Sequence, residues 1–332
     1  MANNRRRFLK VCGSSIAGGV FASPALLEAV ADEGVKPKAS TRIGFIADVH
    51  QDIMHDGVVR LKKFIAAMND RKVDMIVNLG DFCVPHSRND PFLATWKTFT
   101  GPRFHVIGNH DTDEGFTREQ VVDRYEMPSR YYSADVAGLH VVVLDANDPD
   151  GKTKRYPMFI AADQLEWLRK DLHETTRPTV VCVHQPIDSF DKWVINAGEV
   201  RSILRSAKTE RGSPKVVAVF SGHAHLDYVT TSDEIPHVQI NSASYAWVGI
   251  DHANYSEEIT NQRPRLRKAC PYAEPLWAVA TLDFERGELR LEGRESQWVG
   301  SDPWELGIDE DKYQRSRELS RPAIRNITTR LG

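Results

Sequence analysis

The chain has 332 residues, of which 41% are hydrophobic, 27% charged and 9% aromatic, and its formal net charge is −3. This length can bury a sizeable core, as one large domain or two small ones. The slightly acidic balance argues against a sleeve around nucleic acid, because such proteins carry a basic excess. No apolar stretch is long and clean enough for a membrane span, so we do not expect an integral membrane protein.

Residues 1–31 are typical of an export signal. Arg5-Arg6 and Phe8-Leu9-Lys10 precede a weakly apolar segment, 11–27, that is rich in Gly, Ala and Ser. Ala29-Val30-Ala31 then has the small-x-small pattern that a signal peptidase accepts. The arrangement resembles a bacterial twin-arginine signal, and the alternative is a basic, disordered tail. We predict recognition by the twin-arginine export machinery and a periplasmic or extracellular location.

The four cysteines, Cys12, Cys83, Cys182 and Cys270, form neither a CxxC pair nor a closely spaced set. They therefore predict no disulfide framework. Removal of the signal would also remove Cys12, and at least one of the remaining thiols would then stay unpaired.

From Thr41 the sequence alternates strand and helix patterns. Apolar runs predict buried strands, and apolar side chains spaced to line one face predict helices between them. In chain order the predicted elements are strand 42–47, helix 56–70, strand 74–79, helix 91–99, strand 104–107, a helix from 117, strand 139–144, helix 161–174, strand 179–183, helix 199–208 and strand 216–220. Thr117-Arg118-Glu119-Gln120 has the form of a capping box, which predicts a helix start.

After residue 220 the pattern changes to consecutive strands. These strands are predicted at 238–245, 276–284 and 288–293. The polar stretch 251–273 interrupts them and is predicted as a lid or a surface excursion. We predict one catalytic domain over 41–300 and a C-terminal tail over 301–332. The tail is predicted to contain a helix around 311–319, and the sequence does not indicate what it packs on.

Five of the predicted strands end in side chains that can bind a metal ion or transfer a proton. These side chains are Asp48 and His50, Asp81, Asn109 and His110, His184, and His223 and His225. In open α/β sheets, ligands bind outside the carboxyl ends of the strands. Each signal is weak alone, since a Gly-Asp pair is usually a turn and a lone histidine is usually a core residue. Their recurrence at five strand ends predicts a metal site.

Two of these strand ends carry paired ligands. Asp48-x-His50 and His223-x-His225 would each place both side chains on one side of an extended backbone. Each pair could then hold one ion or straddle two. Carboxylate, imidazole and amide groups together suit Mn, Fe, Zn or Co better than Ca or a metal that prefers thiolates.

The strand-end motifs resemble the complete signature of the calcineurin-like metallophosphoesterases. The motifs are Asp48-x-His50, Gly80-Asp81, Gly108-Asn109-His110-Asp111, His184 and Gly222-His223-x-His225, and Gln164-Leu165-Glu166-Trp167-Leu168 is a further feature of that family. The resemblance spans 42–245. It implies a four-layer α/β/β/α sandwich of two mixed sheets with a dinuclear metal site at the carboxyl ends of the strands.

The resemblance also implies a role for each residue. One divalent ion would be held by Asp48, His50, Asp81 and His225, and the other by Asp81, Asn109, His184 and His223, with Asp81 bridging. A water between two ions roughly 3.5–4 Å apart loses a proton near neutral pH and becomes a nucleophile. His110 would bind neither ion and would donate a proton to the leaving oxygen. Asp111 would either orient His110 or cap the following turn.

The predicted function is a phosphodiesterase that acts on a small phosphate ester. The alternatives are a phosphomonoesterase, a nucleoside-diphosphate-type pyrophosphatase and an exported metal-binding protein without turnover. Intact His110 argues against the last, because a purely structural metal site has no use for it. No Gly-x-Ser-x-Gly elbow is present, which argues against a serine hydrolase. His86, Arg88, Tyr245 and Trp247 are candidates to face the substrate, with ordinary loop or core roles as their alternatives.

Overall fold

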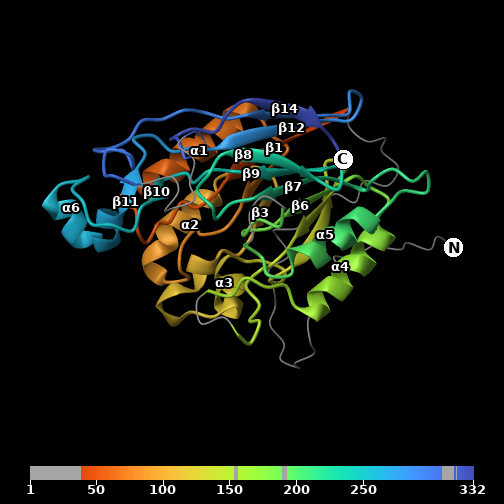
Figure 1. Cartoon of the computed structure of the whole chain (residues 1–332), viewed down its shortest axis with the longest axis horizontal. Coiled ribbons are helices and arrows are strands. Elements are labelled where there is room, and N and C mark those ends of the chain that lie inside the picture. Colours follow the sequence, from red (N-terminus) through yellow and green to blue (C-terminus); the bar gives the residue numbers. More distant parts are fainter. Residues whose placement is uncertain (1–38, 153–155, 189–192, 309–317, 319) are drawn as a thin grey trace.

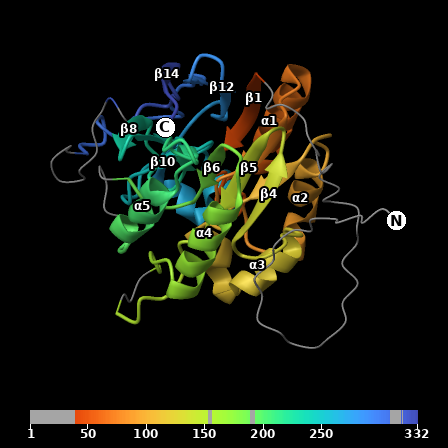
Figure 2. The same ribbon diagram turned by 90° about the vertical axis from the view of Figure 1, so that its right-hand side faces the viewer.

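Two six-stranded sheets pack face to face and carry helices on their outer faces (Figure 1). The computed structural model describes residues 39–152, 156–188, 193–308, 318 and 320–332. Helices α1 (Gly57–Arg71) and α2 (Asp90–Trp96) cover the first sheet, and α4 (Ala162–Glu174) and α5 (Ala197–Ser206) cover the second (Figure 2). The predicted α/β/β/α arrangement of two mixed sheets is therefore confirmed.

The first sheet joins an early parallel part of the chain to a late antiparallel part. Its strands are β1 (Ser40–Ile46), β2 (Met75–Asn78), β3 (Arg103–His105), β12 (Ala278–Asp283), β13 (Glu288–Glu292) and β14 (Ile327–Arg330). Strands β1, β2 and β3 run parallel, and β12 pairs with β1 in the antiparallel sense. The spatial order is β14-β13-β12-β1-β2-β3. Because β1, β2 and β3 are parallel neighbours, their carboxyl ends lie at the same edge of the sheet.

The second sheet has a parallel centre and antiparallel edges. Its strands are β4 (Tyr132–Val136), β5 (Leu139–Val143), β6 (Thr179–Cys182), β7 (Val216–Ser221), β8 (Tyr228–Ser232) and β9 (Ile235–Gln239). The order is β4-β5-β6-β7-β9-β8, with β5, β6, β7 and β9 parallel. The edge strands β4 and β8 were not predicted, because their alternation of apolar and polar residues is short.

The core lies between the sheets and under the helices. Phe45 of β1 stacks on Phe220 of β7 with ring centroids 4.2 Å apart, which joins the two sheets. On the outer side of α1, polar residues face solvent, while Leu61, Phe64 and Met68 are fully buried. This is the spacing that predicted the helix, because side chains three and four positions apart share a face.

Helix α3 (Arg118–Arg124) begins where the sequence predicted a capping box. The backbone nitrogen of Gln120 donates to Oγ1 of Thr117 at 3.3 Å, and the backbone nitrogen of Thr117 donates to Oε1 of Gln120 at 2.8 Å. The reciprocal bonds satisfy two backbone donors that a helix start leaves open.

The single strand predicted at 238–245 is wrong. Strand β9 ends at Gln239, and the chain leaves the sheet before it forms β10 (Tyr245–Trp247). The polar residues Ser242 and Ser244 cause the break, since their hydroxyls donate to the carbonyls of Asp48 at 2.9 Å and Val49 at 2.8 Å. The segment therefore supports the loop that follows β1.

The stretch 251–273 is ordered and packs on the rest of the domain. It contains α6 (Glu257–Gln262), the 3-10 helix η4 (Pro264–Lys268) and β11 (Ala269–Pro271), which pairs with β10. These elements lie together at one end of the molecule (Figure 1). Leu266 is fully buried in a cluster with Ile53 and Met54, so the segment rests directly beyond His50.

Strand β14 places the end of the tail on the edge of the first sheet, where it pairs with β13. The predicted signal at 1–31 and most of the predicted helix at 311–319 lie outside the described residues. Within the described ranges, no helix combines the length and apolar character needed to cross a bilayer.

Candidate metal centre

The predicted ligands converge at one edge of the molecule, where the two sheets meet. They come from the loops after β1, β2 and β3 in the first sheet and after β6 and β7 in the second. Six of them are buried to 5% exposure or less, namely Asp48, His50, Asp81, Asn109, His184 and His225. Residues separated by as many as 177 positions, Asp48 and His225, are thus brought into contact.

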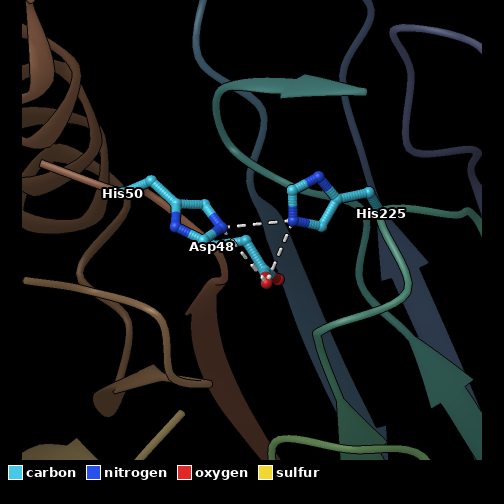
Figure 3. Close-up of side chains that lie close together, drawn as sticks. All are labelled: Asp48, His50 and His225. Carbon is cyan, nitrogen blue, oxygen red and sulfur yellow. Dashed lines mark hydrogen bonds and ion pairs between the residues drawn. The ribbon is translucent and has the colours of Figure 1, made fainter. Parts of the chain in front are cut away.

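Asp48, His50 and His225 form the first group of ligands (Figure 3). The Nε2 atoms of His50 and His225 lie 3.3 Å apart, and Oδ1 of Asp48 lies 3.3 Å from Nε2 of His225 and 3.9 Å from Nε2 of His50. Both rings turn the same nitrogen toward the carboxylate, which is the arrangement expected around a shared cation.

Asp81, His184 and His223 form the second group. Nε2 of His184 lies 3.2 Å from Oδ2 of Asp81 and 3.2 Å from Nδ1 of His223. The same Oδ2 atom of Asp81 lies 3.6 Å from Nε2 of His50 in the first group. The carboxylate of Asp81 therefore lies between the two groups, where the sequence predicted a bridging ligand.

The donor atoms fit divalent cations. Oδ1 of Asn109 is buried and has no hydrogen-bond donor among the described residues, a costly state unless a cation binds it. Burial lowers the pKa values of His50 and His223 well below the ordinary value, so both rings are neutral and offer lone pairs. Burial acts the same way on His184, but Asp81 and Asp48 raise its pKa to about 9. An ion that binds His184 therefore has to displace a proton.

Two backbone carbonyls fix the orientation of the ligand histidines. Nδ1 of His184 donates to the carbonyl of Leu79 at 2.7 Å, and Nδ1 of His225 donates to the carbonyl of Tyr245 at 2.8 Å. Each bond places the ring proton on Nδ1 and leaves Nε2 free to bind an ion. These acceptors were not predictable from sequence, because they depend on which loops meet in space.

The prediction that Asp48-x-His50 and His223-x-His225 lie on extended backbone is wrong. Asp48, His50, Asp81, His223 and His225 all have φ between 50° and 72°. This left-handed region is uncommon for residues other than glycine and is often found at functional sites. Successive sharp turns aim the side chains inward.

Gly108 is needed for space and not for a special backbone conformation. Its φ of −91° and ψ of 166° lie in the extended region that any residue can adopt. A Cβ at this position would overlap the backbone nitrogen and Oδ1 of Asp81. The missing side chain lets the loops after β2 and β3 approach closely.

His110 is oriented by Asp113, which the sequence reasoning missed. Nδ1 of His110 lies 2.8 Å from Oδ2 of Asp113, and Tyr156 donates to the other oxygen of Asp113 at 2.6 Å. Burial by itself lowers the pKa of His110, but the carboxylates of Asp81 and Asp113 raise it above its ordinary value. A 3-10 turn begins at Asn109 and is interrupted by a kink at Asp113, whose side chain lies beside the ring of His110. The spacing of three residues could have suggested the pair.

Asp111 holds the loop and does not orient His110. Its Oδ2 accepts from the backbone nitrogen of Gly108 at 2.7 Å, and its Oδ1 accepts from Phe82 at 2.7 Å and from the hydroxyl of Tyr125 at 3.0 Å. Of the two roles left open by the sequence, the structure shows the cap.

The four candidates for facing the substrate differ in their surroundings. His86 caps a 3-10 helix by accepting from the backbone nitrogen of Arg88 at 3.0 Å. Arg88 in turn pairs with Asp52 and Glu114. Tyr245 is buried beneath His50, with ring centroids 5.1 Å apart, whereas Trp247 is partly exposed.

The Gln164 motif stabilises a strand end next to the site. The side chain of Gln164 accepts from the backbone nitrogen of Asp145 at 2.9 Å and donates to its carbonyl at 2.8 Å. Asn147, two residues further on, donates to the carbonyl of Ile107 at 3.0 Å. These bonds tie the end of β5 to the strand that carries Asn109.

Several known proteins are similar to this chain in sequence. A protein of Synechococcus named as a probable cyclic nucleotide phosphodiesterase is 27% identical over 165 residues, which cover 49% of this chain and 62% of that protein. A manganese-dependent ADP-ribose/CDP-alcohol diphosphatase of Oryza sativa is 24% identical over 255 residues, covering 55% and 76%. Purple acid phosphatase 21 of Arabidopsis thaliana is 32% identical over 182 residues, 47% of this chain and 38% of that one.

A dimetal phosphatase from Danio rerio has a similar fold, with a TM-score of 0.56 at 17% identity over 78% of this chain and 98% of that chain. The sequence matches to the Synechococcus and Arabidopsis relatives span less than two thirds of the length of those proteins. The family model described as calcineurin-like phosphoesterase matches residues 41–227, which is more than half of the chain. The chain belongs to the calcineurin-like phosphoesterase family.

Proposed function

We propose that this chain is a metal-dependent phosphodiesterase in which two divalent ions and His110 act on a small phosphate ester. The observation that supports this most directly is the position of Asp81, whose Oδ2 lies within 3.6 Å of a histidine from each ligand group. A carboxylate in that position can bind two ions at once. The printed names of the relatives cover phosphodiester, phosphomonoester and diphosphate chemistry, so the choice among them is part of the proposal.

The protein residues would hold the centre in the following way. Asp48, His50 and His225 would bind one ion, His184, His223 and Asn109 the other, and Asp81 both. Two such ions supply Lewis acidity and activate a water molecule when bound. Asn109 contributes a neutral oxygen, so the centre keeps enough positive charge to attract an anionic ester.

His110 is proposed as the acid that protonates the leaving oxygen. Asp113 accepts a hydrogen bond from Nδ1 and thereby fixes the ring of His110. Nε2 is then the nitrogen that would face the substrate. The carboxylate of Asp113 beside Nδ1 favours the protonated form of the ring, which is the form that an acid needs. A positioned acid of this kind contributes roughly 10²- to 10⁴-fold to a rate.

A reconstitution series tests the proposed function. The metal-free protein would be loaded with Mn, Fe, Zn or Co and assayed on 4-nitrophenyl phosphate, bis(4-nitrophenyl) phosphate and a nucleoside diphosphate ester. We expect the highest kcat/KM on a substrate whose phosphorus carries two substituents. A clear preference for the monoester would contradict the phosphodiesterase assignment, and no turnover with any metal would contradict the enzymatic one.

Export through the twin-arginine route is proposed on the sequence of residues 1–31 alone. The paired change Arg5→Lys and Arg6→Lys keeps the charge but removes the guanidinium groups. We expect it to keep the protein in the cytoplasm of a bacterial host that exports the unchanged chain, as measured by cell fractionation. Equal amounts of both proteins in the periplasmic fraction would contradict the proposal.

A further inference from the structure

The segment 251–273 places one arginine at the rim of the metal centre. Leu266 anchors η4 in the core, and Asn254 donates to the carbonyls of Leu266 at 2.6 Å and Ala269 at 2.7 Å. The neighbouring residue, Arg265, points outward with 47% of its side chain exposed. Its backbone is therefore fixed while its guanidinium remains accessible.

Arg265 joins Asp113, Tyr156 and Trp247 in what we call the rim cluster. Its Nη1 donates to Oδ2 of Asp113 at 2.8 Å, its Nη2 lies 3.4 Å from Nδ1 of His110, and its guanidinium carbon lies 6.0 Å from the Trp247 ring centroid. Because Nδ1 of His110 carries a proton toward Asp113, the Nη2 contact is no hydrogen bond. The Nη2 protons of Arg265 are thus not used by His110.

His110 lies between the metal groups and the rim cluster. Its ring centroid is 5.2 Å from that of His50, a ligand of the first group, and 4.8 Å from that of Tyr156. If the phosphoryl group of a substrate binds at the ions, the part of the substrate that extends beyond His110 lies beside the rim cluster. If His110 protonates the leaving oxygen, the part of the substrate beside Arg265 belongs to the leaving group.

Two other arginines near the site are already neutralised by carboxylates. Arg88 pairs with both Asp52 and Glu114, and Arg118 pairs with Asp145 and Asp148. In the part of the chain that the structure describes, Asp113 is the only carboxylate within ion-pair distance of Arg265, and it is shared with His110. A guanidinium has five N–H donors, so Arg265 can bind a second anion without releasing the first.

We propose that Arg265 determines specificity by binding an anionic group in the leaving portion of the substrate. The inference rests on the proposed function and narrows it to diphosphates, in which a water oxygen bonds to one phosphorus, the bridging P–O bond breaks, and a phosphate monoester leaves. Arginine recognises phosphate through paired N–H donors, and the ring of Trp247 lies beside the guanidinium. A neutral leaving group would gain nothing from this contact.

A pair of substrates with the same phosphoryl half tests the proposal. Thymidine 5′-monophosphate 4-nitrophenyl ester has a leaving group without a second anion, and thymidine 5′-diphosphoglucose has one that is a phosphate monoester. For Arg265→Ala we expect kcat/KM on the diphosphate to fall about 10- to 100-fold more than on the nitrophenyl ester, since charge-assisted hydrogen bonds are lost only there. Arg265→Lys should restore part of the difference, because it keeps the charge but not the paired donors.

Arg267→Ala is the matched control, since Arg267 lies on the same 3-10 helix and contacts Asn261 at 3.0 Å. It should leave the ratio of the two kcat/KM values unchanged. Calorimetry with the non-hydrolysable α,β-methylene thymidine diphosphate gives a second readout, in which Arg265→Ala should weaken binding and Arg267→Ala should not. Metal content should be equal in all variants.

The outcomes separate this inference from the proposed function. Equal losses on both substrates, with unchanged binding of the methylene analogue, would show that Arg265 only positions Asp113, and would overturn the specificity role while the enzyme assignment stands. Failure of the unchanged protein to turn over either substrate would count against the proposed function. The calorimetric comparison would then still decide whether Arg265 binds the anion.

Discussion

His110 and Asp113 together illustrate what a sequence reveals about single residues. The motif Gly108-Asn109-His110-Asp111 identified the histidine, because it stands at a strand end among other potential ligands. The partner of that histidine could not be predicted in the same way. Asp111 is adjacent in sequence and binds backbone nitrogens, whereas Asp113 reaches the ring from a kink that follows the first turn of the 3-10 segment.

Replacing His110 separates catalysis from metal binding. We expect His110→Ala to keep both ions. It should lower kcat on a methyl phosphate diester by roughly 10²- to 10⁴-fold, because methoxide is a poor leaving group that needs a proton. Metal analysis and kcat measured side by side check this. His173→Ala, at the exposed end of α4, is the control and should retain full turnover. Unchanged kcat in His110→Ala would remove His110 from the mechanism.

Gly108 gives a second prediction at this scale. Gly108→Ala would push a methyl group into Asp81 and should lower both metal content and stability, by roughly 1–3 kcal/mol as for other overpacked sites. Urea unfolding and metal analysis measure the two effects. Gly198→Ala, in helix α5 with its nearest neighbouring atom 3.8 Å away, should be neutral or stabilising. Normal metal binding by Gly108→Ala would show that the loops can move apart.

At the scale of elements, periodic patterns were predictable, whereas three of the four edge strands of the two large sheets, β4, β8 and β14, were not. The long helices α1 and α4 and the central strands follow from apolar spacing. A helix buried on one face has apolar residues three and four positions apart, and a strand buried on both faces is a continuous apolar run. Strands β4 and β8 lie at sheet edges and β10 pairs only with β11, so their sequences carry little of that pattern. The left-handed turns at the ligands were also missed, since histidine and aspartate give no local sign of positive φ.

Strand β5 carries a histidine whose charge links stability to pH. His140 lies 2.7 Å from Asp135 on the neighbouring strand β4 and 2.8 Å from Asp171 on α4. Burial by itself lowers the pKa of His140, but the hydrogen bonds to both carboxylates raise it to about 9. Because an unfolded histidine titrates near 6.5, the stabilisation is complete below about pH 6.5 and is lost as pH rises toward 9.

We therefore expect wild-type protein to lose more stability than His140→Gln between pH 6 and pH 9.5. The difference should be about 2–3 kcal/mol, reduced by the solvent exposure of Asp135. Urea unfolding of both proteins at the two pH values measures it, and taking the difference cancels the titration of groups that they share. Parallel curves for the two proteins would mean that His140 is not charged in the folded state.

At the scale of the whole molecule, the C-terminal segment is part of the structure that holds the metal centre. Arg325 donates to Asp227 through its backbone nitrogen at 3.0 Å and through Nε at 2.8 Å. Asp227 is buried and follows His225 by two residues. The sequence did not predict this contact, because a charged segment has the same sequence pattern whether it is solvated or paired with a distant residue.

Arg325→Ala should weaken metal binding from a distance. Removal of the guanidinium leaves a buried carboxylate short of donors, which costs roughly 1–3 kcal/mol and loosens the loop that carries His223 and His225. Thermal unfolding and a metal titration check both effects. Arg330→Ala, an exposed arginine on β14, is the control and should change neither. Equal metal affinity in the two variants would contradict the link between the tail and the centre.

The left-handed conformation of five ligands has a consequence for how this protein can change over generations. Each such residue costs on the order of 1–3 kcal/mol, and ligand contacts are what repay it when ions are bound. A lineage that no longer needed the reaction could replace Asp48, His50 or Asp81 with glycine or asparagine and become harder to unfold. Selection for heat resistance alone would therefore act against these conformations, whereas metal binding requires them.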